Sequence, residues 1–207
     1  IVNKARTAGK PVIVATQMLA SMEHNARPTR AEVADVTNSV VDHTDAVMLS
    51  GESSMGAFPV EAVTTMAEIA YHTEQSPYDD VSAALPLTFH SEETRIARAT
   101  YDFAREVGAA GIVIFSESGY TGRMLSHFRP EQKMVVVTNK PKTYRQLALV
   151  WGVYPLLESG DNRSQCVARA IERSVEQGVL RKGDLVITVL GTTKTGKQLR
   201  LTGSRLV

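Results

Sequence analysis

Two short apolar runs stand out near the start of the chain, and each ends in polar residues. One is PVIVATQ at residues 11–17, and the other is AVMLSGE at residues 46–52. Short apolar runs bounded by polar residues or glycine are typical of buried strands. We therefore predict two strands, at residues 11–16 and 46–49, with a polar loop after each.

The segment between these runs has the pattern of one capped helix. Thr29 and Glu32 have the spacing of a capping box, so a helix is expected to begin there and to end near Asp42. A strand, a helix and a second, parallel strand form the repeating unit of a (β/α) barrel, whose chemistry takes place at the carboxyl ends of its strands. In such a barrel Thr16 and Ser50 are neighbours on the catalytic face.

The chain changes character near residue 77. Before it, Phe58-Pro59 begins a further helix, whose apolar side chains recur at Val60, Val63, Ala67 and Ala70. Residues 77–91 contain two prolines and no clean hydrophobic period, which is typical of a linker. We therefore divide the chain into residues 1–76, the linker 77–91 and a second domain at residues 92–207.

Helical and strand patterns alternate regularly in the second domain. Such alternation favours a three-layer α/β fold with a mostly parallel sheet. A hairpin loop at residues 191–198 would make the last strand antiparallel. The expected helices are 92–107, one after Gly119, 143–150 and 163–177, and the expected strands are 112–115, 134–137, 153–156, 185–190 and about 199–207.

Composition and charge narrow the classes of function only slightly. Of 207 residues, 43% are hydrophobic and 22% are charged, which is ordinary for a soluble protein and predicts a cytoplasmic location. A net charge of +1 favours neither nucleic acid nor a membrane surface as a partner. No apolar run approaches the length of a membrane span.

The cysteine and the histidines predict neither a disulfide nor a metal site. Cys166 is the single cysteine and lies in a helical apolar pattern, so we expect a buried structural thiol. The histidines have no mutual spacing that is typical of metal ligands. They are His24, His43, His72, His90 and His127.

The polar strand ends at Thr16-Gln17 and Ser50-Gly51-Glu52 are the first group of residues with candidate chemistry. A hydroxyl at a strand end can donate a hydrogen bond to a substrate carboxylate. The commoner role of such a threonine is that of a turn or cap residue, and a buried glutamate beside it can equally be structural.

Residues 116–123, SESGYTGR, follow an apolar strand and open a helix. Free backbone N–H groups, three aliphatic hydroxyls and the positive end of the helix dipole would then point to one place, which is the chemistry of a phosphate cradle. The alternative is an ordinary strand-to-helix turn in which Ser118 merely caps the helix.

Five segments together resemble the pyruvate kinase family, and they span essentially the whole chain. They are VATQMLASM (14–22), RPTRAEVADV (27–36), VMLSGES (47–53), SESGYTGR (116–123) and LRKGDLVITVLGT (180–192). The resemblance implies the end of a (β/α)8 TIM barrel in residues 1–76, followed by the family's C-terminal α/β domain. Family members begin with several hundred residues that hold the catalytic lysine, the Mg2+-binding carboxylates and the K+ site. We therefore expect a C-terminal portion of the enzyme that is inactive alone.

The resemblance gives the first group of residues a role. In pyruvate kinases the threonine of the ATQM stretch contacts the carboxylate of phosphoenolpyruvate or pyruvate, which assigns Thr16 to substrate binding. Gln17, Ser50 and Glu52 would surround it. The implied reaction transfers a phosphoryl group from phosphoenolpyruvate to ADP and gives pyruvate and ATP, with Mg2+ and K+ bound by residues outside this chain.

The resemblance also implies an allosteric site. In allosteric pyruvate kinases the loop that matches residues 116–121 binds the phosphate of a sugar-phosphate effector, assisted by the loop that matches residues 191–197. Tyr120 stands where an arginine or lysine is common in the family. The implied effector residues are Ser116, Glu117, Ser118, Gly119, Tyr120, Thr121, Lys194 and Gly196.

Assembly is the last implication of the resemblance. The helix predicted from Thr29 would pack against its copy in a homotetramer, with Arg30 and Asp35 at the interface. A different class of function remains open, namely a stand-alone, non-catalytic module for sugar-phosphate binding or assembly. The complete reading frame distinguishes the two, because the enzyme needs the lysine and the metal ligands.

Overall fold

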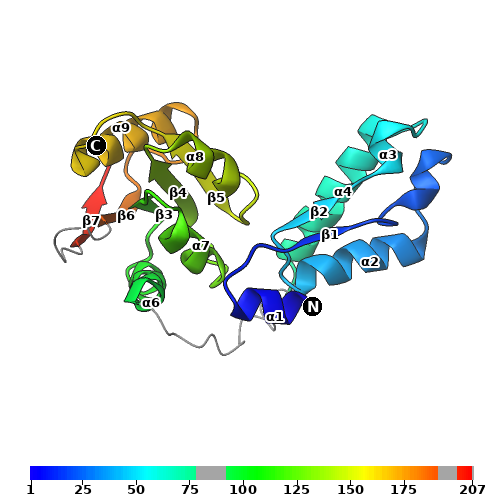
Figure 1. Cartoon of the computed structure of the whole chain (residues 1–207), viewed down its shortest axis with the longest axis horizontal. Coiled ribbons are helices and arrows are strands. Elements are labelled where there is room, and N and C mark those ends of the chain that lie inside the picture. Colours follow the sequence, from blue (N-terminus) through cyan, green and yellow to red (C-terminus); the bar gives the residue numbers. More distant parts are fainter. Residues whose placement is uncertain (78–91, 191–199, 207) are drawn as a thin grey trace. The chain divides into compact units, whose positions relative to one another are not determined.

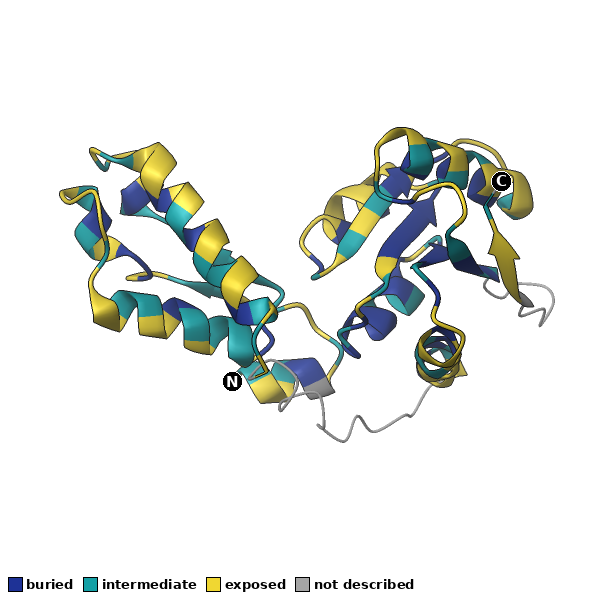
Figure 2. Ribbon diagram, turned by 180° about the vertical axis from the view of Figure 1, so that it is seen from behind, coloured by how far each residue is buried: buried dark blue, intermediate teal, exposed yellow. Residues whose placement is uncertain are grey.

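The computed structural model describes residues 1–77, 92–190 and 200–206 and falls into two compact units (Figure 1). The first unit is Ile1–Leu87, and the second is Thr88–Val207. Each unit buries an apolar core of its own, and in each unit the buried residues are surrounded by exposed ones (Figure 2).

A pair of short parallel strands forms the centre of the first unit. Ile13 lies opposite Ala46 and Ala15 lies opposite Met48. The carboxyl ends of both strands therefore lie at the same edge, as predicted for a piece of a (β/α) barrel. The elements are α1 (Val2–Thr7), β1 (Ile13–Ala15), η1 (Ala20–Glu23), α2 (Arg30–Val41), β2 (Ala46–Met48), α3 (Gly51–Ser54) and α4 (Pro59–Glu74).

Helix α2 begins where the sequence predicts because Thr29 and Glu32 do form the capping box. The Thr29 hydroxyl accepts a hydrogen bond from the Glu32 backbone N–H at 3.3 Å, and Glu32 Oε2 accepts from the Thr29 backbone N–H at 2.7 Å. These bonds satisfy two backbone donors at the helix start. Asp42 ends the helix as its C-cap.

The buried face of α4 differs from the prediction. Val60 and Val63 of the predicted face are 72% and 54% exposed, whereas Ala62 and Met66 are buried. The helix has apolar residues on more than one side, and spacing alone does not say which side meets α2 and η1. The core of this unit consists of Met18, Leu19, Met22, Val36, Ala62 and Met66.

The second unit contains a sheet of five strands in the order β5-β4-β3-β6-β7. All neighbouring pairs are parallel except β6 and β7, which are antiparallel, so the predicted, mostly parallel α/β fold is confirmed. The elements are α6 (Glu92–Glu106), β3 (Gly111–Phe115), α7 (Tyr120–Ser126), β4 (Lys133–Thr138), α8 (Pro141–Leu147), β5 (Val153–Leu157), α9 (Arg163–Glu176), β6 (Leu185–Leu190) and β7 (Arg200–Arg205).

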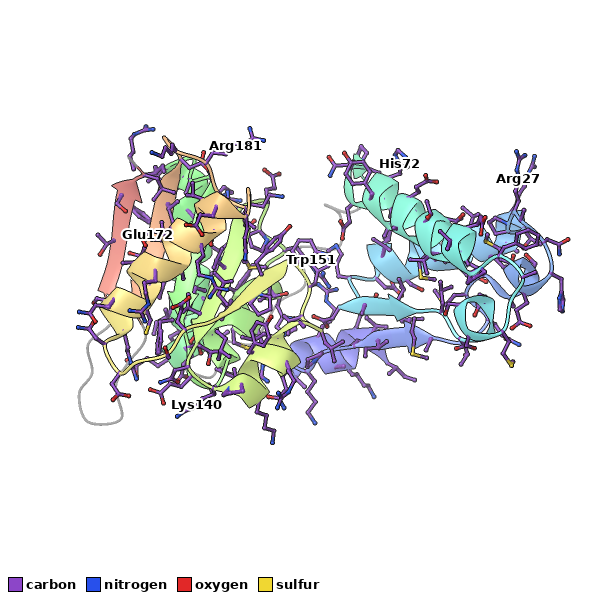
Figure 3. The ribbon with its side chains drawn as sticks, turned by 90° about the horizontal axis from the view of Figure 1, so that it is seen from above. Arg27, His72, Lys140, Trp151, Glu172 and Arg181 are labelled. Carbon is purple, nitrogen blue, oxygen red and sulfur yellow. The ribbon has the colours of Figure 1, made fainter. Side chains whose placement is uncertain are left out.

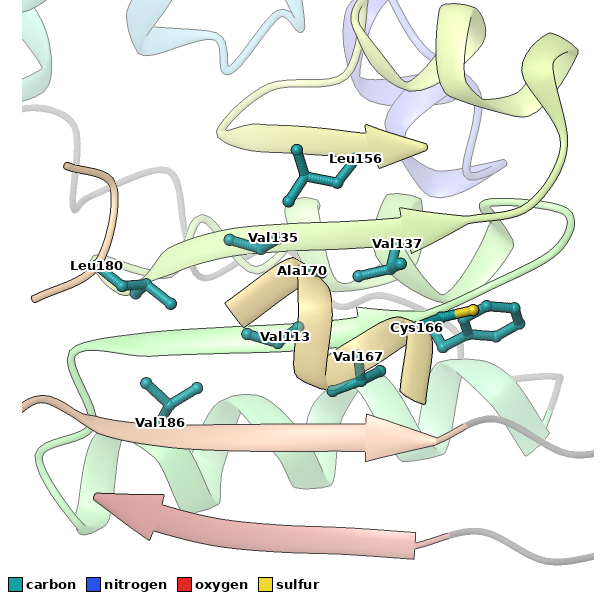
Figure 4. Close-up of a cluster of buried hydrophobic side chains, with 10 residues drawn as sticks. Val113, Val135, Val137, Leu156, Cys166, Val167, Ala170, Leu180 and Val186 are labelled. Atoms are coloured by element: carbon teal, nitrogen blue, oxygen red, sulfur yellow. The ribbon is translucent and has the colours of Figure 1, made fainter. Parts of the chain in front are cut away.

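Helix α9 covers one face of this sheet and packs on alternate residues of the strands (Figure 4). Val136, which lies between two of these residues, packs instead against Leu147 of α8. The central strands β3 and β4 are therefore buried on both faces, as their near-continuous apolar residues indicate. The buried set under α9 includes Val113, Val135, Val137, Cys166, Val167 and Ala170.

Three short helices differ from the prediction. Helix α8 begins at Pro141 and ends at Leu147, rather than spanning residues 143–150. The earlier start is possible because proline is accommodated in the first turn of a helix. The elements η1 and α3 follow β1 and β2, where the sequence indicated only polar loops. Each is about one turn long, which is too short for a hydrophobic period to be visible. Within the described ranges, no helix has the length and apolar character needed to cross a membrane.

Candidate functional site

The first candidate site is the edge formed by the carboxyl ends of β1 and β2. Thr16 and Gln17 follow β1 directly and are exposed, and their φ angles are 73° and 56°. This left-handed region favours glycine, and a residue that is not glycine loses roughly 1–2 kcal/mol there. Ser50 follows β2 at the same edge, because Ala15 pairs with Met48. The sequence predicted that Thr16 and Ser50 lie at one edge, but it did not predict the left-handed turn.

Glu52 lies between the two strand ends and is almost completely buried, with 2% of its surface exposed. Its Oε1 accepts a hydrogen bond from the Leu19 backbone N–H at 3.0 Å, and its Oε2 accepts one from the Ser50 backbone N–H at 2.7 Å. One carboxylate therefore connects the loop after β1 to the loop after β2.

The pKa of Glu52 is set by two opposing effects. Burial raises the pKa, because it penalises the charged form. Hydrogen bonds from the backbone N–H groups of Glu52, Ser50 and Leu19 outweigh burial and hold the pKa below its usual value. Glu52 is therefore a carboxylate at neutral pH, and it accepts hydrogen bonds rather than supplying a proton.

Glu32 is a second hydrogen-bonded carboxylate of the first unit. The sequence predicted its capping box with Thr29 but not its bonds to Ser21. Its Oε1 also accepts from the Ser21 backbone N–H at 2.7 Å, and its Oε2 accepts from the Ser21 hydroxyl. Burial raises the pKa of Glu32, but the hydrogen bonds from Ser21 and Thr29 outweigh burial and lower the pKa from 4.5 to about 2. Glu32 thus ties η1 to the start of α2.

The second candidate site is the loop between β3 and α7. Gly119 is the N-cap of α7 with a φ of 73°, and a Cβ built there would lie 3.0 Å from Leu147 and 3.1 Å from Thr143. Glycine alone adopts this positive φ without strain and has no Cβ that would crowd these two side chains. The Ser118 hydroxyl accepts from the Tyr120 backbone N–H at 3.3 Å, so Ser118 does make a local turn bond.

Glu117 gives this loop a negative charge that a phosphate site does not need. Its Oε1 pairs with Arg163 Nη2 at 2.8 Å, and its carbonyl accepts from the Thr143 hydroxyl at 2.8 Å. The Arg163 guanidinium also lies over the Phe115 ring, 5.3 Å from its centroid. Sequence reasoning missed Arg163, because it is separated from Glu117 by 46 residues and belongs to no recognisable motif.

The remaining predicted effector residues are only partly placed. Ser116 is buried, and its backbone N–H donates to the Val137 carbonyl at 2.8 Å. Tyr120 and Thr121 are partly exposed in the first turn of α7. The other two predicted residues, Lys194 and Gly196, lie outside the described residues.

The described residues offer no set of ligands for a metal ion. No group of three or more His, Cys, Asp or Glu side chains that could hold one occurs in residues 1–77, 92–190 and 200–206. His72 lies on α4, in the first unit (Figure 3). His90 lies outside the described residues.

Arg30 and Asp35, predicted at a subunit interface, are both exposed on α2.

Two family models match the chain in succession. Residues 1–63 match the barrel domain of pyruvate kinase, and residues 94–199 match the pyruvate kinase alpha/beta domain. The first match contains the edge with Thr16, and the second contains the loop with Glu117. The order of the matches is the order in which the sequence predicted the two folds.

Two relatives and one solved structure are similar to the chain over most of its length. Pyruvate kinase of Clostridium acetobutylicum is 40% identical over 194 residues, which cover 92% of this chain and 41% of the relative. Pyruvate kinase 2 of Synechocystis is 45% identical over 193 residues, which cover 93% of this chain and 32% of the relative. The structure of Cryptosporidium parvum pyruvate kinase in complex with ADP is 33% identical with a TM-score of 0.84, and the match covers 100% of this chain and 42% of that one.

The chain spans between 32% and 42% of the length of these relatives. One family model alone matches residues 94–199, which is more than half of the chain. Together with the barrel match, this shows that the chain belongs to the pyruvate kinase family.

Proposed function

We propose that this chain forms the C-terminal part of an enzyme that transfers a phosphoryl group from phosphoenolpyruvate to ADP and gives pyruvate and ATP. The observation that carries the proposal is the succession of a barrel match and an α/β-domain match along almost the whole chain. The ADP in the complex of the Cryptosporidium parvum relative supports a nucleotide as the second substrate.

In this proposal Thr16 donates a hydrogen bond to the carboxylate of phosphoenolpyruvate. Thr16 follows β1 and is exposed, and barrels bind their substrates at the carboxyl ends of strands. Gln17, Ser50 and Glu52 surround this position. The lysine, Mg2+ and K+ that stabilise charge on the transferred group act from outside this chain.

The full-length enzyme tests the proposal, and it is obtained from the gene's own reading frame or by joining this chain to the preceding part of the Clostridium acetobutylicum relative. We expect this enzyme to phosphorylate ADP with phosphoenolpyruvate when Mg2+ and K+ are present. The 207-residue chain alone is expected to show no turnover. A folded full-length protein without activity contradicts the proposal, and so does turnover by the purified chain.

Thr16→Val tests the substrate contact, because valine keeps the shape of threonine and removes the donor. The expected loss is about 5- to 150-fold in kcat/KM for phosphoenolpyruvate, with the KM for ADP little changed. Thr64→Val is the matched control, since Thr64 is an exposed threonine on α4. Equal kcat/KM values for the two variants would make Thr16 only a strand-end residue.

We further propose that the loop at residues 116–121 binds the phosphate of a sugar-phosphate effector, together with Lys194 and Gly196. The left-handed Gly119, the nearby hydroxyls and the start of α7 support this proposal. An effector changes activity only when it binds one state of the enzyme better than another.

We also propose that the full-length protein is a homotetramer, in which Arg30 and Asp35, both exposed on α2, contact a neighbouring subunit. The states between which the effector distinguishes would be states of this homotetramer.

The effector is tested by activity of the full-length enzyme at subsaturating phosphoenolpyruvate. Fructose bisphosphate, ribose 5-phosphate, glucose 6-phosphate and AMP are added one at a time, to the original enzyme and to Ser118→Asp. The added carboxylate repels phosphate, so activation by one compound should disappear in the variant. Activation that persists undiminished places the effector elsewhere, and no response to any compound leaves the loop as an ordinary turn.

A further inference from the structure

The turn after β1 is strained, and the strain requires a cause elsewhere in the fold. Among the described residues, Thr16 and Gln17 are the two adjacent non-glycine residues with positive φ, and threonine is β-branched. Such a conformation persists only where the surroundings over-determine it. The residues that follow are well anchored, since Met18 and Leu19 belong to the buried core of the unit.

The Glu52 carboxylate is the group that joins this turn to the second strand end. Each of its oxygens accepts one backbone N–H, from Leu19 at 3.0 Å and from Ser50 at 2.7 Å. Leu19 is three residues after Thr16, and Ser50 is two residues after the end of β2. Movement of either loop relative to the other would break one of these bonds.

We propose that Glu52 is a positioning residue, which fixes the left-handed Thr16–Gln17 turn against the loop at Ser50 so that the Thr16 hydroxyl lies in one place. This inference rests on the proposed function, in which that hydroxyl binds the substrate carboxylate. Glu52 itself touches no substrate atom in this arrangement.

The chemistry of the carboxylate explains why a neutral amide is not equivalent. Both oxygens of an ionised glutamate accept hydrogen bonds, whereas a glutamine has one acceptor and one donor group. In Glu52→Gln the amide NH2 would therefore face a backbone N–H, either that of Leu19 or that of Ser50. One connection between the two loops is lost, although the side chain keeps its size.

Glu32 provides a matched control for this substitution. It is the same residue type in the same unit, and it accepts at least as many hydrogen bonds, from Ser21 and Thr29. Those partners tie η1 to α2, so they do not join the two strand ends. Glu32→Gln should therefore destabilise the fold without moving Thr16.

The experiment measures steady-state kinetics and thermal unfolding of Glu52→Gln and Glu32→Gln in the full-length enzyme. Both variants should unfold at lower temperature. Glu52→Gln should also raise the KM for phosphoenolpyruvate on the order of tenfold, with the KM for ADP unchanged. Glu32→Gln should leave both KM values within about twofold. If the two variants affect KM alike, Glu52 has only a structural role.

A double-mutant cycle with Thr16→Val adds a readout that a structural role does not move. If Glu52 acts through the Thr16 hydroxyl, Glu52→Gln should change the KM for phosphoenolpyruvate less than about twofold once that hydroxyl is absent. Full multiplication of the two effects overturns the inference. Should Glu52→Gln fail to fold, Glu52→Asp tests the same step, because its shorter side chain cannot reach both N–H groups.

The outcomes separate the inference from the proposed function. An unsubstituted full-length enzyme that is inactive with phosphoenolpyruvate and ADP removes the proposed function. An active enzyme in which Glu52→Gln has an unchanged KM for phosphoenolpyruvate removes only the role of Glu52.

Discussion

Helix α7 approaches β4 through a glycine, and the closeness of that approach sets the cost of adding one methyl group. A Cβ built on Gly122 would lie 2.7 Å from Cγ2 and 3.1 Å from Cγ1 of Val136. Gly122→Ala therefore forces Val136 or α7 to move, and such overpacking costs about 1–3 kcal/mol. Alanine in a helix gains about 1 kcal/mol over glycine. We expect a net loss of about 1 kcal/mol in the free energy of unfolding of the second unit.

Removal of the clashing side chain should reverse the sign of this effect. Val136→Ala alone should cost about 2 kcal/mol, because Val136 is completely buried. In that background the two methyl groups that the new Cβ would meet are absent. Gly122→Ala should then stabilise by about 1 kcal/mol, which makes the coupling between the two substitutions about 2 kcal/mol.

Trp151 provides an assay that reports on the second unit alone. It is the single tryptophan of the chain, and it lies in the second unit with the Arg129 guanidinium 4.4 Å from its ring centroid (Figure 3). Its fluorescence during urea unfolding gives the free energies for all four members of the cycle. The control is Gly178→Ala, where a Cβ would meet no atom within 4 Å. Its φ of 71° makes alanine strained there, but this cost should be the same with and without Val136→Ala. Gly122→Ala that stabilises the original chain, or additive effects in the double variant, would refute the packing argument.

Two further predictions concern charged side chains, one at the start of α2 and one in the loop between β3 and α7. The folded-state pKa of Glu32 is lowered from 4.5 to about 2, so its stabilisation is complete above pH 4.5 and is lost as the pH falls toward 2. The difference in unfolding free energy between the original chain and Glu32→Gln should therefore be roughly 1–2 kcal/mol at pH 6, after solvent screening, and shrink by pH 3; a constant difference counts against it. Glu117→Gln removes the negative charge from the effector loop while Arg163 remains, so the activating sugar phosphate should bind more tightly in a titration of the full-length enzyme, and weaker binding would mean that the ion pair shapes the site.

The parts of the fold that the sequence predicts well depend on local signals. Thr29 and Glu32 lie three residues apart, and their chemistry at a helix start is the same in any tertiary surrounding. The alternating helices and strands of the second unit are likewise visible as runs of apolar residues, because a parallel sheet buries both of its faces. The same local reasoning also fixed the edge at which Thr16 and Ser50 lie.

The parts that the sequence does not predict depend on contacts between distant residues. Glu52 meets the Leu19 N–H across 33 positions, and Glu117 meets Arg163 across 46. The prediction of which side of α4 is buried was wrong for a related reason. Val60 and Ala62 are both apolar, and packing against the neighbouring helix decides which of them is buried. When two faces of a helix are similarly apolar, only tertiary contacts determine which face is buried.

The left-handed turn at Thr16 and Gln17 is where local rules fail most clearly. A β-branched threonine after a strand favours a continued extended backbone, so neither residue signals positive φ. The carboxylate that joins this turn to the second strand end, Glu52, accepts the Leu19 backbone N–H across 33 positions and comes later in the chain. Glycine at position 16 would relieve the strain and would remove the hydroxyl. Residues whose backbone departs from local preference cluster at functional sites, because strain persists only where it is held in place. The strained backbone of Thr16 therefore supports the hypothesis that its hydroxyl has a function.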